Sequence, residues 1–558
     1  MNHSEKKAPE SPDALAASAL QPAEGVNVKL LIGILVSAAF VVILNETTLS
    51  VALPALMQEF NITASAGQWL TTAFMLTMAV VIPMTGFIMQ RFTLRSIYIM
   101  AMATFLVGTI VAVFATHFAV LLLARVIQAT GTALVMPLLM TTIMRLVPVE
   151  RRGSVFGLVT VVIAVAPALG PTFSGIVLET LGWRWIFGLV VPLVVIALVV
   201  GALQVRNFEE PSRPYLDVIS VVLSAVGFSA TLYGIAGMSE LPNGVPWDRV
   251  IILLAGVLVL VLFFRRQLSL AKTAESTGKN PLLNLAPLAS REYTLSMILM
   301  LLSFSMLFGF IILMPLYAQN VMGLSQMAAG MVSLPGGLIM GLMGPFVGRM
   351  YDQRGARPLI IPGSLVMLVA MLGFANLSRT ESWFAGLGSH GSQVHLVVLT
   401  ILLNVGVSLM LTPLMSNALA SVPDSLASHG QAIVNTFQQV AGGAGTAVFV
   451  AIMSFASASY AKSLGLGKVA GQASGEGAGE AAGGTAGDAA AGAAGGAGSA
   501  TGHAPSPEQM AQVTADIVGH GIEVAFWFGV AVSFIVVVAV SVLKIEARPV
   551  AKGQATAQ

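Results

Sequence analysis

Long apolar runs alternate along the chain with short stretches rich in Pro, Gly and charged residues. A helix needs roughly 20 apolar residues to cross a bilayer, and most of these runs reach that length. The runs are continuous rather than alternating in polarity, which excludes the strands of a membrane barrel. The pattern therefore predicts fourteen membrane-spanning helices, at residues 30–54, 66–89, 96–116, 118–146, 153–178, 184–205, 216–238, 249–268, 294–318, 325–349, 357–377, 394–422, 430–457 and 521–545.

Three polar segments lie outside these spans. Residues 1–29 are polar and lack an apolar signal-peptide core, which predicts a disordered tail. Residues 269–293 predict a loop between the eighth and ninth spans. Residues 458–520 predict a disordered loop, because within 471–500 there are 11 Gly and 12 Ala, which bury too little apolar area to fold.

Composition and charge agree with a membrane protein. The 558 residues are 56% hydrophobic and 9% charged, too few charges to cover the surface of a soluble globular protein. The net charge of +2 gives no case for a nucleic-acid partner. Of the 27 Lys and Arg residues, 21 fall on the side of the two termini and five on the other. The positive-inside rule then predicts that both termini are cytoplasmic.

A short internal repeat links the second and tenth spans. Segments 86–95 and 348–357 match at an offset of 262 residues, so that Gly86 aligns with Gly348 and Arg95 with Arg357. Two parallel six-helix units are a recurring transporter architecture, with the binding site between them near the middle of the membrane. The repeat predicts such a duplication, with spans seven and eight as an insertion.

Several motifs stand in chain order on the predicted spans: 44–54, 86–95, Arg125-x-x-Gln128-x-x-Gly131, 166–175, 182–187, 348–357 and 435–443. With these motifs the chain resembles the major facilitator superfamily. More narrowly, it resembles the fourteen-helix drug:proton antiporters of the EmrB/QacA type. Asn45 stands where that family often has Asp, with the acid one residue later, as in the lincomycin-resistance-like branch. In segment 86–95, Gln90 and Thr93 replace the usual Asp and Gly, whereas the second copy keeps Asp352 and Gly355.

The resemblance implies an all-α integral membrane protein with two six-helix halves and two inserted helices. The expected organisation is a cytoplasmic tail (1–29), an N-terminal half (30–205), an inserted helix pair (206–268), a cytoplasmic loop (269–293), a C-terminal half (294–545) that includes the disordered external loop 458–520, and a second cytoplasmic tail (546–558).

Glu46 is the acid that we place within an apolar span. Burial favours the neutral form of a carboxyl group, so such a Glu can take up and release a proton near neutral pH. The alternative is a Glu solvated at a helix end. Arg125 is a second charge within a span, with Gln128 on the same helix face. The resemblance implies that Arg125 senses or relays the protonation of the first-span acid; the alternative is a structural Arg that binds backbone carbonyls.

Other polar and small residues are candidates for the cavity or for conformational gating. The cavity candidates are Asn45, Gln128, Asn404, Asn435, Gln438 and Gln439, for which simple helix-to-helix hydrogen bonds are the alternative. The gating candidates are Gly86, Arg91, Arg95, Gly348, Asp352, Arg357, Pro167, Gly170, Pro171 and Gly175. Asp352 suits a helix cap or an ion pair with Arg354 or Arg357, and the alternative is a solvated loop charge. Close helix packing is the alternative for the Pro and Gly residues.

The favoured function is a proton-coupled transporter that exports amphipathic drug-like compounds across a bacterial inner membrane by alternating access. No enzyme is expected: no phosphate-binding loop, zinc-binding pattern or nucleophile motif occurs, and no cofactor or metal is implied. The expected partners are the lipid bilayer, protons and a small-molecule substrate. A periplasmic adaptor and an outer-membrane channel are further partners that the sequence neither indicates nor excludes. The alternatives are an exporter of a metabolite, peptide or siderophore, and a sensor or scaffold that does not transport.

Overall fold

The computed structural model describes residues 27–62, 64–205, 207, 217–237, 246–277, 281–380, 391–423, 426–464 and 507–542. Within these residues every regular element is a helix. Residues 1–26, the Gly/Ala segment 471–500 and the tail 546–558 lie outside the described residues, and so do the expectations made for them.

Each of the fourteen predicted spans corresponds to a helix or to a short series of helices. The first six are α2 (Val28–Phe60), α3 (Ala64–Val81) with η1 (Ile82–Met84) and α4 (Thr85–Arg91), α5 (Leu94–Val113), α6 (Phe118–Leu146), α7 (Val149–Thr180), and α8 (Arg184–Gly188) with α9 (Val190–Gln204). The inserted pair is α10 (Val218–Ala236) and α11 (Trp247–Thr277). The last six are α12 (Arg291–Leu316), α13 (Gln326–Arg354), α14 (Arg357–Phe374), α16 (Gly391–Ala420), α17 (Ala427–Ser463) and α20 (Pro507–Val542).

Thirteen helices in the described part of the chain are long and apolar enough to cross a membrane. Helix α7, with 32 residues, is the fourteenth long helix of the bundle. It packs along α2 on one side and along α13 on the other. The all-helical fold expected from the sequence is therefore confirmed.

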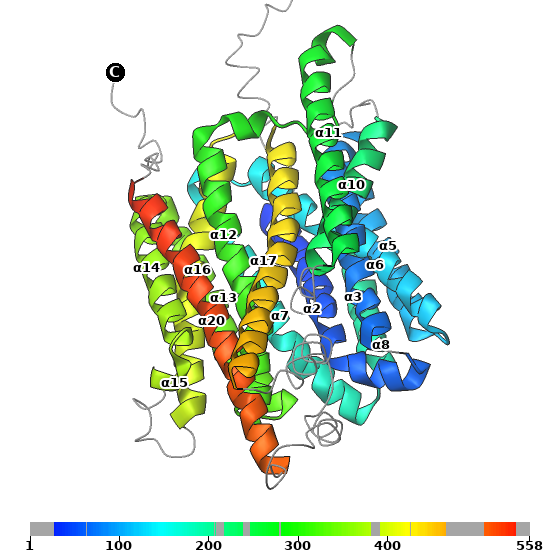
Figure 1. Ribbon diagram of the computed structural model, residues 1–558. Helices are drawn as coiled ribbons and strands as arrows, with labels where there is room; N and C mark the ends of the chain where they lie inside the picture. Colours follow the sequence, from blue (N-terminus) through cyan, green and yellow to red (C-terminus); the bar gives the residue numbers. More distant parts are fainter. Residues whose placement is uncertain are drawn as a thin grey trace, which may run out of the picture.

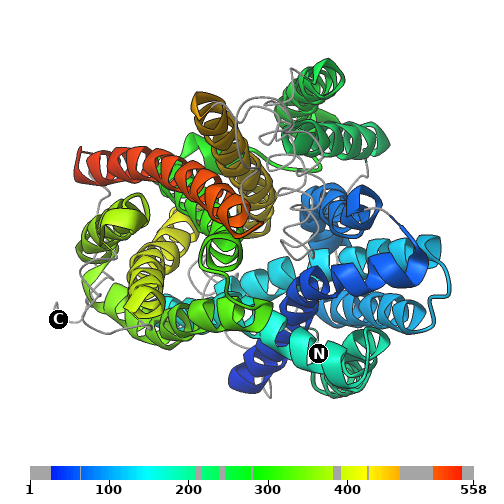
Figure 2. The ribbon, with the colours of Figure 1, turned by 60° about the horizontal axis from the view of Figure 1, so that its bottom comes forward.

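The helices form two groups that lie side by side (Figures 1 and 2). In one group α5 packs on α6 and α9, and α2 packs on α6 and α7. In the other, α16 packs on α13 and α14, and α17 packs on α12 and α20. The contact of α7 with α13 is the most extensive one between the groups. The α10–α11 pair lies beside both groups, where α10 contacts α3 and α17.

Polar residues at the span boundaries fix where several helices begin and end. The side chains of Asn27, Thr93, Ser290 and Ser325 each accept a hydrogen bond from a backbone N–H of the following helix. Such caps satisfy donors that the first helical turn leaves unpaired. Gly355 ends α13 with a φ of 78°, a backbone conformation that strongly favours glycine.

The polar ends of several helices extend further than the apolar pattern indicates. Loop 458–520 was predicted as disordered throughout, but α17 continues to Ser463 and α20 begins at Pro507. Loop 269–293 is likewise shortened, because α11 continues to Thr277, and a 3-10 turn, η3 (Ala286–Ala289), precedes α12. Hydropathy detects only the part of a helix that lies inside the bilayer. The polar first turn of α20 is instead favoured by Pro507 at the first helical position, where Pro is well tolerated.

One end of the bundle contains the ends of α4, α6, α13, α16 and α20 and the starts of α2, α5, α7, α14 and α17 (Figure 1). We call it the Asp352 end; it is at the top of Figure 1.

Candidate functional site

A buried polar cluster joins three helices of the first group. Arg125 of α6 is 1% exposed, and its Nη1 donates to Oε1 of Gln128 at 3.0 Å and to Oδ1 of Asn45 on α2 at 3.5 Å. Nε2 of Gln128 in turn donates to Oγ1 of Thr109 on α5 at 3.0 Å. The Arg125 guanidinium also lies 4.2 Å from the ring centroid of Phe74 on α3, a cation–π distance.

Two donors of this cluster have no hydrogen-bond partner among the described atoms: Nε of Arg125 and Nδ2 of Asn45. Buried polar groups are nearly always paired, because an unpaired one loses its hydration without compensation. Both free groups are donors, so the cluster has fewer acceptors than donors. It is suited to receive one additional acceptor, most favourably an anionic one that also balances the buried guanidinium.

Glu46 is the carboxylic acid next to this cluster. It follows Asn45 on α2, is half-buried, and interacts electrostatically with Arg125. The structure thus brings together four residues that the sequence analysis selected separately: Asn45, Glu46, Arg125 and Gln128. A carboxyl group beside a buried guanidinium and an apolar wall has a charge state that is sensitive to small rearrangements of its neighbours.

Helix α7 packs tightly on α2 beside the cluster. Oγ of Ser174 donates to the carbonyl oxygen of Thr48 at 2.7 Å. A methyl group at Gly170 would lie 2.1 Å from Oγ1 of Thr47, whereas one at Gly175 would have no neighbour within 4 Å. Only Gly170 therefore has a close approach to explain it. Pro167 is half-buried, and the side chain of Pro171 lies outside the described residues.

At the Asp352 end, α7 and α13 cross through glycines. A Cβ at Gly348 would lie 1.9 Å from the carbonyl oxygen of Gly153, and one at Gly157 would lie 2.0 Å from that of Gly344. The carboxylate of Asp352 then accepts hydrogen bonds of 2.9 Å from the backbone N–H groups of Gly153 and Ser154. These N–H groups belong to the fifth and sixth residues of α7, so Asp352 joins the end of α13 to the second turn of α7.

The first copy of the repeat makes the corresponding contact with α17. Gln90, which aligns with Asp352, has its amide nitrogen 2.7 Å from Nε2 of His429 in the first turn of α17. A Cβ at Gly86 would lie 2.8 Å from Nδ1 of the same histidine. Each copy of the repeat therefore joins its own half to the first turns of a helix in the other half, through a carboxylate in one case and an amide in the other.

Arg91, Arg95 and Arg357 are exposed at the Asp352 end. The contact recorded for Arg95 is through its backbone, whose N–H donates to Oδ1 of Asn207 at 3.1 Å.

The cavity candidates of the second group have local contacts. Nδ2 of Asn404 donates to the carbonyl oxygen of Thr400 at 2.9 Å, and Oδ1 of Asn435 accepts from Nε2 of Gln431 at 2.7 Å. Nε2 of Gln438 lies 3.6 Å from Sδ of Met300, and Gln439 is half-buried. These contacts lie within the second group, so the structure does not join these residues to the Arg125 cluster.

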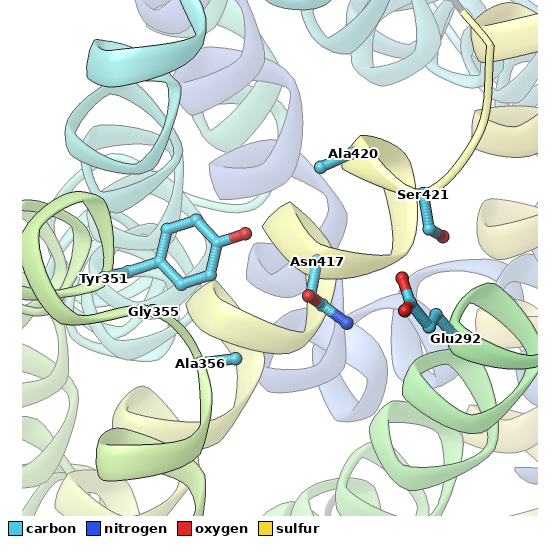
Figure 3. Close-up of a pocket in the computed structure, with 7 residues that line it drawn as sticks. All are labelled: Glu292, Tyr351, Gly355, Ala356, Asn417, Ala420 and Ser421. Carbon is cyan, nitrogen blue, oxygen red and sulfur yellow. The ribbon is translucent and has the colours of Figure 1, made fainter. Parts of the chain in front are cut away.

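A small cavity lies elsewhere, next to Asp352 (Figure 3). Its volume is about 30 Å³, and it is lined by Glu292, Tyr351, Gly355, Ala356, Asn417, Ala420 and Ser421. The hydroxyl of Tyr351 and the carboxylate of Glu292 approach Asn417 from two different helices (Figure 3). Drug-sized ligands occupy about 300–1,000 Å³, so this cavity is too small for one.

Sequence reasoning missed several residues that complete these contacts. Phe74 and Thr109 belong to ordinary apolar runs and gave no signal, although they line the Arg125 cluster. His429 and Gln431 are not among the candidates selected from the sequence, because neither is a charged residue within an apolar run. Among the described residues, no group of three or more His, Asp or Glu side chains has the arrangement of a metal site.

The fold and these contacts define a class of protein. Two helix groups are joined at one end through the two copies of the repeat, and the first group contains a buried arginine beside a carboxylic acid. This is the architecture of a polytopic membrane transporter of the duplicated type. The sequence model of the Major Facilitator Superfamily matches residues 35–217 and 215–446. The chain belongs to the Major Facilitator Superfamily.

Individual relatives agree with this assignment. The chain is 38% identical to the uncharacterised MFS-type transporter YcnB of Bacillus subtilis over 77% of this chain and 87% of the relative. It is 38% identical to the lincomycin resistance protein LmrB of Listeria monocytogenes, over 76% of this chain and 86% of the relative. A structure of the human organic anion transporter MFSD10 covers 78% of this chain and 95% of its own, with a TM-score of 0.53 and 14% identity, which is a likeness of fold alone.

Proposed function

We propose that the protein exports drug-like amphipathic compounds from a bacterial cell in exchange for protons. The observation that carries the substrate class is its similarity, over three quarters of the chain, to relatives named as lincomycin resistance proteins in Listeria monocytogenes and Bacillus subtilis. A more distant relative, 25% identical, is named as a multidrug resistance protein B homolog of Mycobacterium tuberculosis. This similarity favours drug export over the export of a metabolite, peptide or siderophore.

The contacts between the two groups support alternating access. The contact of Asp352 with the backbone of α7 and the contact of Gln90 with His429 both join the two groups at the Asp352 end. The hydrogen bonds at each contact would break together when the two groups rock apart, which suits a closure that opens during transport. Both contacts are formed in this structure, which in this proposal is the state with the Asp352 end closed. Transport then alternates this arrangement with one in which both contacts are broken.

Glu46 carries the coupled proton in this proposal. The two unpaired donors of the Arg125 cluster, Nε of Arg125 and Nδ2 of Asn45, would form stronger, charge-assisted hydrogen bonds with an ionised Glu46 than with a neutral one. Proton uptake would release the carboxyl group from Arg125 and alter the packing of α2 on α6. A negative-inside potential drives inward proton movement with about 2.3 kcal/mol per 100 mV.

The domain organisation and orientation complete the proposal. Residues 30–205 and 294–545 are the two halves, 206–268 is the inserted pair, and the Asp352 end faces the cytoplasm together with both termini. The membrane is the bacterial inner membrane. The concentration of Lys and Arg at this end supports the orientation. Residues 269–293 then form a cytoplasmic connection.

The deciding experiment uses purified protein in vesicles with an imposed pH gradient. Addition of lincomycin, or of a cationic dye as a second substrate, is expected to release protons and to accumulate the compound against its gradient. Growth inhibition with and without the protein, across a panel of antibiotics, then ranks the substrates. Transport of the compound without proton movement would contradict the coupling, and no transport of any panel compound would contradict the drug-export proposal.

A further inference from the structure

The inserted helices α10 and α11 contact both halves of the transporter. Trp69 of α3 stacks on Tyr233 of α10 with ring centroids 6.0 Å apart. Phe264 of α11 stacks on Phe437 of α17 at 6.3 Å, with the two rings within 7° of parallel. The inserted pair therefore contacts both of the halves that move relative to each other in the proposed transport cycle.

At the Asp352 end this pair contains a buried hydrogen-bond chain. Asp217 accepts from Nε and Nη2 of Arg266 at 2.6 and 2.9 Å, and Oγ of Ser220 also donates to it. Nε2 of Gln267 donates to Oγ of Ser220 at 2.6 Å, and Oε1 of Gln267 accepts from the backbone N–H of Leu283 at 3.1 Å. Asp217, Ser220 and Gln267 are each at most 3% exposed. The chain therefore fixes the connecting segment, residues 281–285, against α11.

The next residue of the segment extends the chain to the contact between the halves. The backbone N–H of Asn284 donates to Nδ1 of His429 at 3.4 Å, and Nε2 of His429 lies 2.7 Å from the amide of Gln90. The imidazole ring of His429 therefore lies between the backbone of Asn284 and the side-chain amide of Gln90. His429 is 6% exposed, so water does not readily replace these partners.

We propose that Gln267 is a positioning residue for closure of the Asp352 end. It holds segment 281–285 so that Asn284 keeps the His429 ring against Gln90, and the inserted pair thereby favours the closed state of the two halves. Gln267 acts through His429 and touches neither the Arg125 cluster nor Glu46. The inference rests on the proposed alternating access, and it gives the two helices beyond the duplicated six a part in the transport cycle.

The reason that one side chain has this leverage is geometric. Leu282 and Leu283 are 2% and 0% exposed. Their burial, together with the hydrogen bond from Gln267, keeps segment 281–285 in a single packed arrangement. Loss of the Gln267 contact leaves a buried N–H of Leu283 unpaired in the closed state. The closed state then loses stability relative to an arrangement in which segment 281–285 separates from α11 and water hydrates its backbone.

The test measures the closure directly, by double electron–electron resonance between spin labels at the Asp352 end. The chain has no cysteine, so introduced cysteines are the sole labelling sites. Arg91 and Ala420 are exposed, lie in different halves, and are the positions to label. The protein is the full chain in lipid nanodiscs, without substrate.

Gln267→Met keeps the volume of the side chain and removes both of its hydrogen bonds. It is expected to increase the ratio of long to short label distances about fivefold, the effect of one buried hydrogen bond on a two-state equilibrium. Ser220→Ala is the matched control, since it removes the neighbouring contact and leaves Gln267 bound to Leu283. It is expected to give the wild-type distribution. His429→Leu breaks the chain at its other end and should match Gln267→Met.

Thermal unfolding of the variants separates positioning from general damage. Gln267→Met and Ser220→Ala should lower the melting temperature by similar amounts, while only the first changes the distances. An unchanged distribution in Gln267→Met and His429→Leu, or an equal shift in Ser220→Ala, would overturn the proposal. Absence of drug transport by the wild-type protein would instead contradict the proposed function, because the distance measurement needs no substrate.

Discussion

Asp352 extends from the end of α13 to the second turn of α7, where its Oδ1 accepts a hydrogen bond of 2.9 Å from the backbone N–H of Gly153. Gly153 has no side chain, and a Cβ there would lie 2.3 Å from that same oxygen. The contact therefore depends on both residue types at once: a carboxylate on one helix and a glycine on the other.

Asp352→Ala should open this end of the transporter. Each hydrogen bond to a charged group contributes about 1.5–3 kcal/mol, so the loss of two would favour the open arrangement by tenfold or more. We expect drug export in vesicles to fall about tenfold while the protein still inserts. Arg354→Ala, an exposed change two residues further along α13, is the control and should keep near wild-type export. Equal losses in both variants would point to a general effect of charge at this end.

The two glycines of segment 166–175 should respond differently to alanine. Gly170→Ala places a methyl group 2.1 Å from Oγ1 of Thr47, which forces α7 away from α2 beside the Arg125 cluster. Overpacking of this kind costs about 1–3 kcal/mol, so transport and melting temperature should both fall. Gly175→Ala meets no atom within 4 Å and should leave both unchanged. Export rate and thermal melting of the two variants decide the question, and a defective Gly175→Ala would show that its role is flexibility.

The sequence predicts the fourteen long helices named above for the described residues, because the apolar runs are about 20 residues long and Pro, Gly and charged residues separate them. It does not predict where the helices end beyond the bilayer. Ser463 and Pro507 end and begin helices whose polar turns are stabilised by local propensity and packing, which hydropathy does not measure.

The site is predictable where a residue is unusual for a membrane and unpredictable where it is ordinary. Glu46 and Arg125 are charges in apolar runs, so their type alone selects them. Phe74 completes the cation–π contact with Arg125, but a Phe in an apolar span carries no information about its neighbours. The pairing of Gln90 with His429 connects residues 339 positions apart, and only the packing of α4 on α17 brings them together.

Asp217 gives the structure a defined response to acid. The hydrogen bonds from the Arg266 guanidinium hold the pKa of Asp217 below its usual value, against the opposing effect of burial. Because the folded pKa lies below the unfolded value of about 3.9, the stabilisation is complete above that pH and is lost as the pH falls through the folded pKa.

Asp217→Asn should lower the stability of the α10–α11 pair by about 2 kcal/mol at neutral pH, through loss of its charge-assisted hydrogen bonds. The measurement is thermal melting of wild type and variant in detergent between pH 7 and pH 3. The difference between the two should be constant down to about pH 4.5 and shrink below it. A difference that grows toward acid pH would mean that Asp217 is destabilised, not stabilised, by Arg266.

Arg125→Lys should not restore what Arg125→Ala removes. The guanidinium contacts Gln128 and Asn45 and lies 4.2 Å from the ring centroid of Phe74, and an ammonium group lacks the planar fork that makes these contacts together. Arg125→Ala leaves Oε1 of Gln128 without its donor, and Arg125→Lys cannot keep all the contacts at once, so export should fall more than tenfold in each. Membrane insertion is checked by fluorescence of a fused reporter. Wild-type export by Arg125→Lys would reduce the role of Arg125 to its charge alone.

Glu46→Gln should separate binding from coupling. Gln holds this position permanently neutral, so a transporter that needs the carboxyl group to gain and lose a proton should lose uphill export driven by a pH gradient. The amide can still donate and accept hydrogen bonds, so the variant should fold, and downhill exchange of substrate across the membrane should persist.

Glu46→Asp retains the proton and shortens the side chain, which should leave partial export. For a cationic substrate, apparent affinity in the wild type should fall as the pH is lowered and protons compete for the site, and this dependence should be absent from Glu46→Gln. Substrate-induced proton release, measured across a pH series for the three proteins, tests both expectations. Proton-coupled export by Glu46→Gln at the wild-type rate would remove Glu46 from the mechanism. The unpaired Nε of Arg125 and Nδ2 of Asn45 would then need another acceptor, such as the substrate or a bound water.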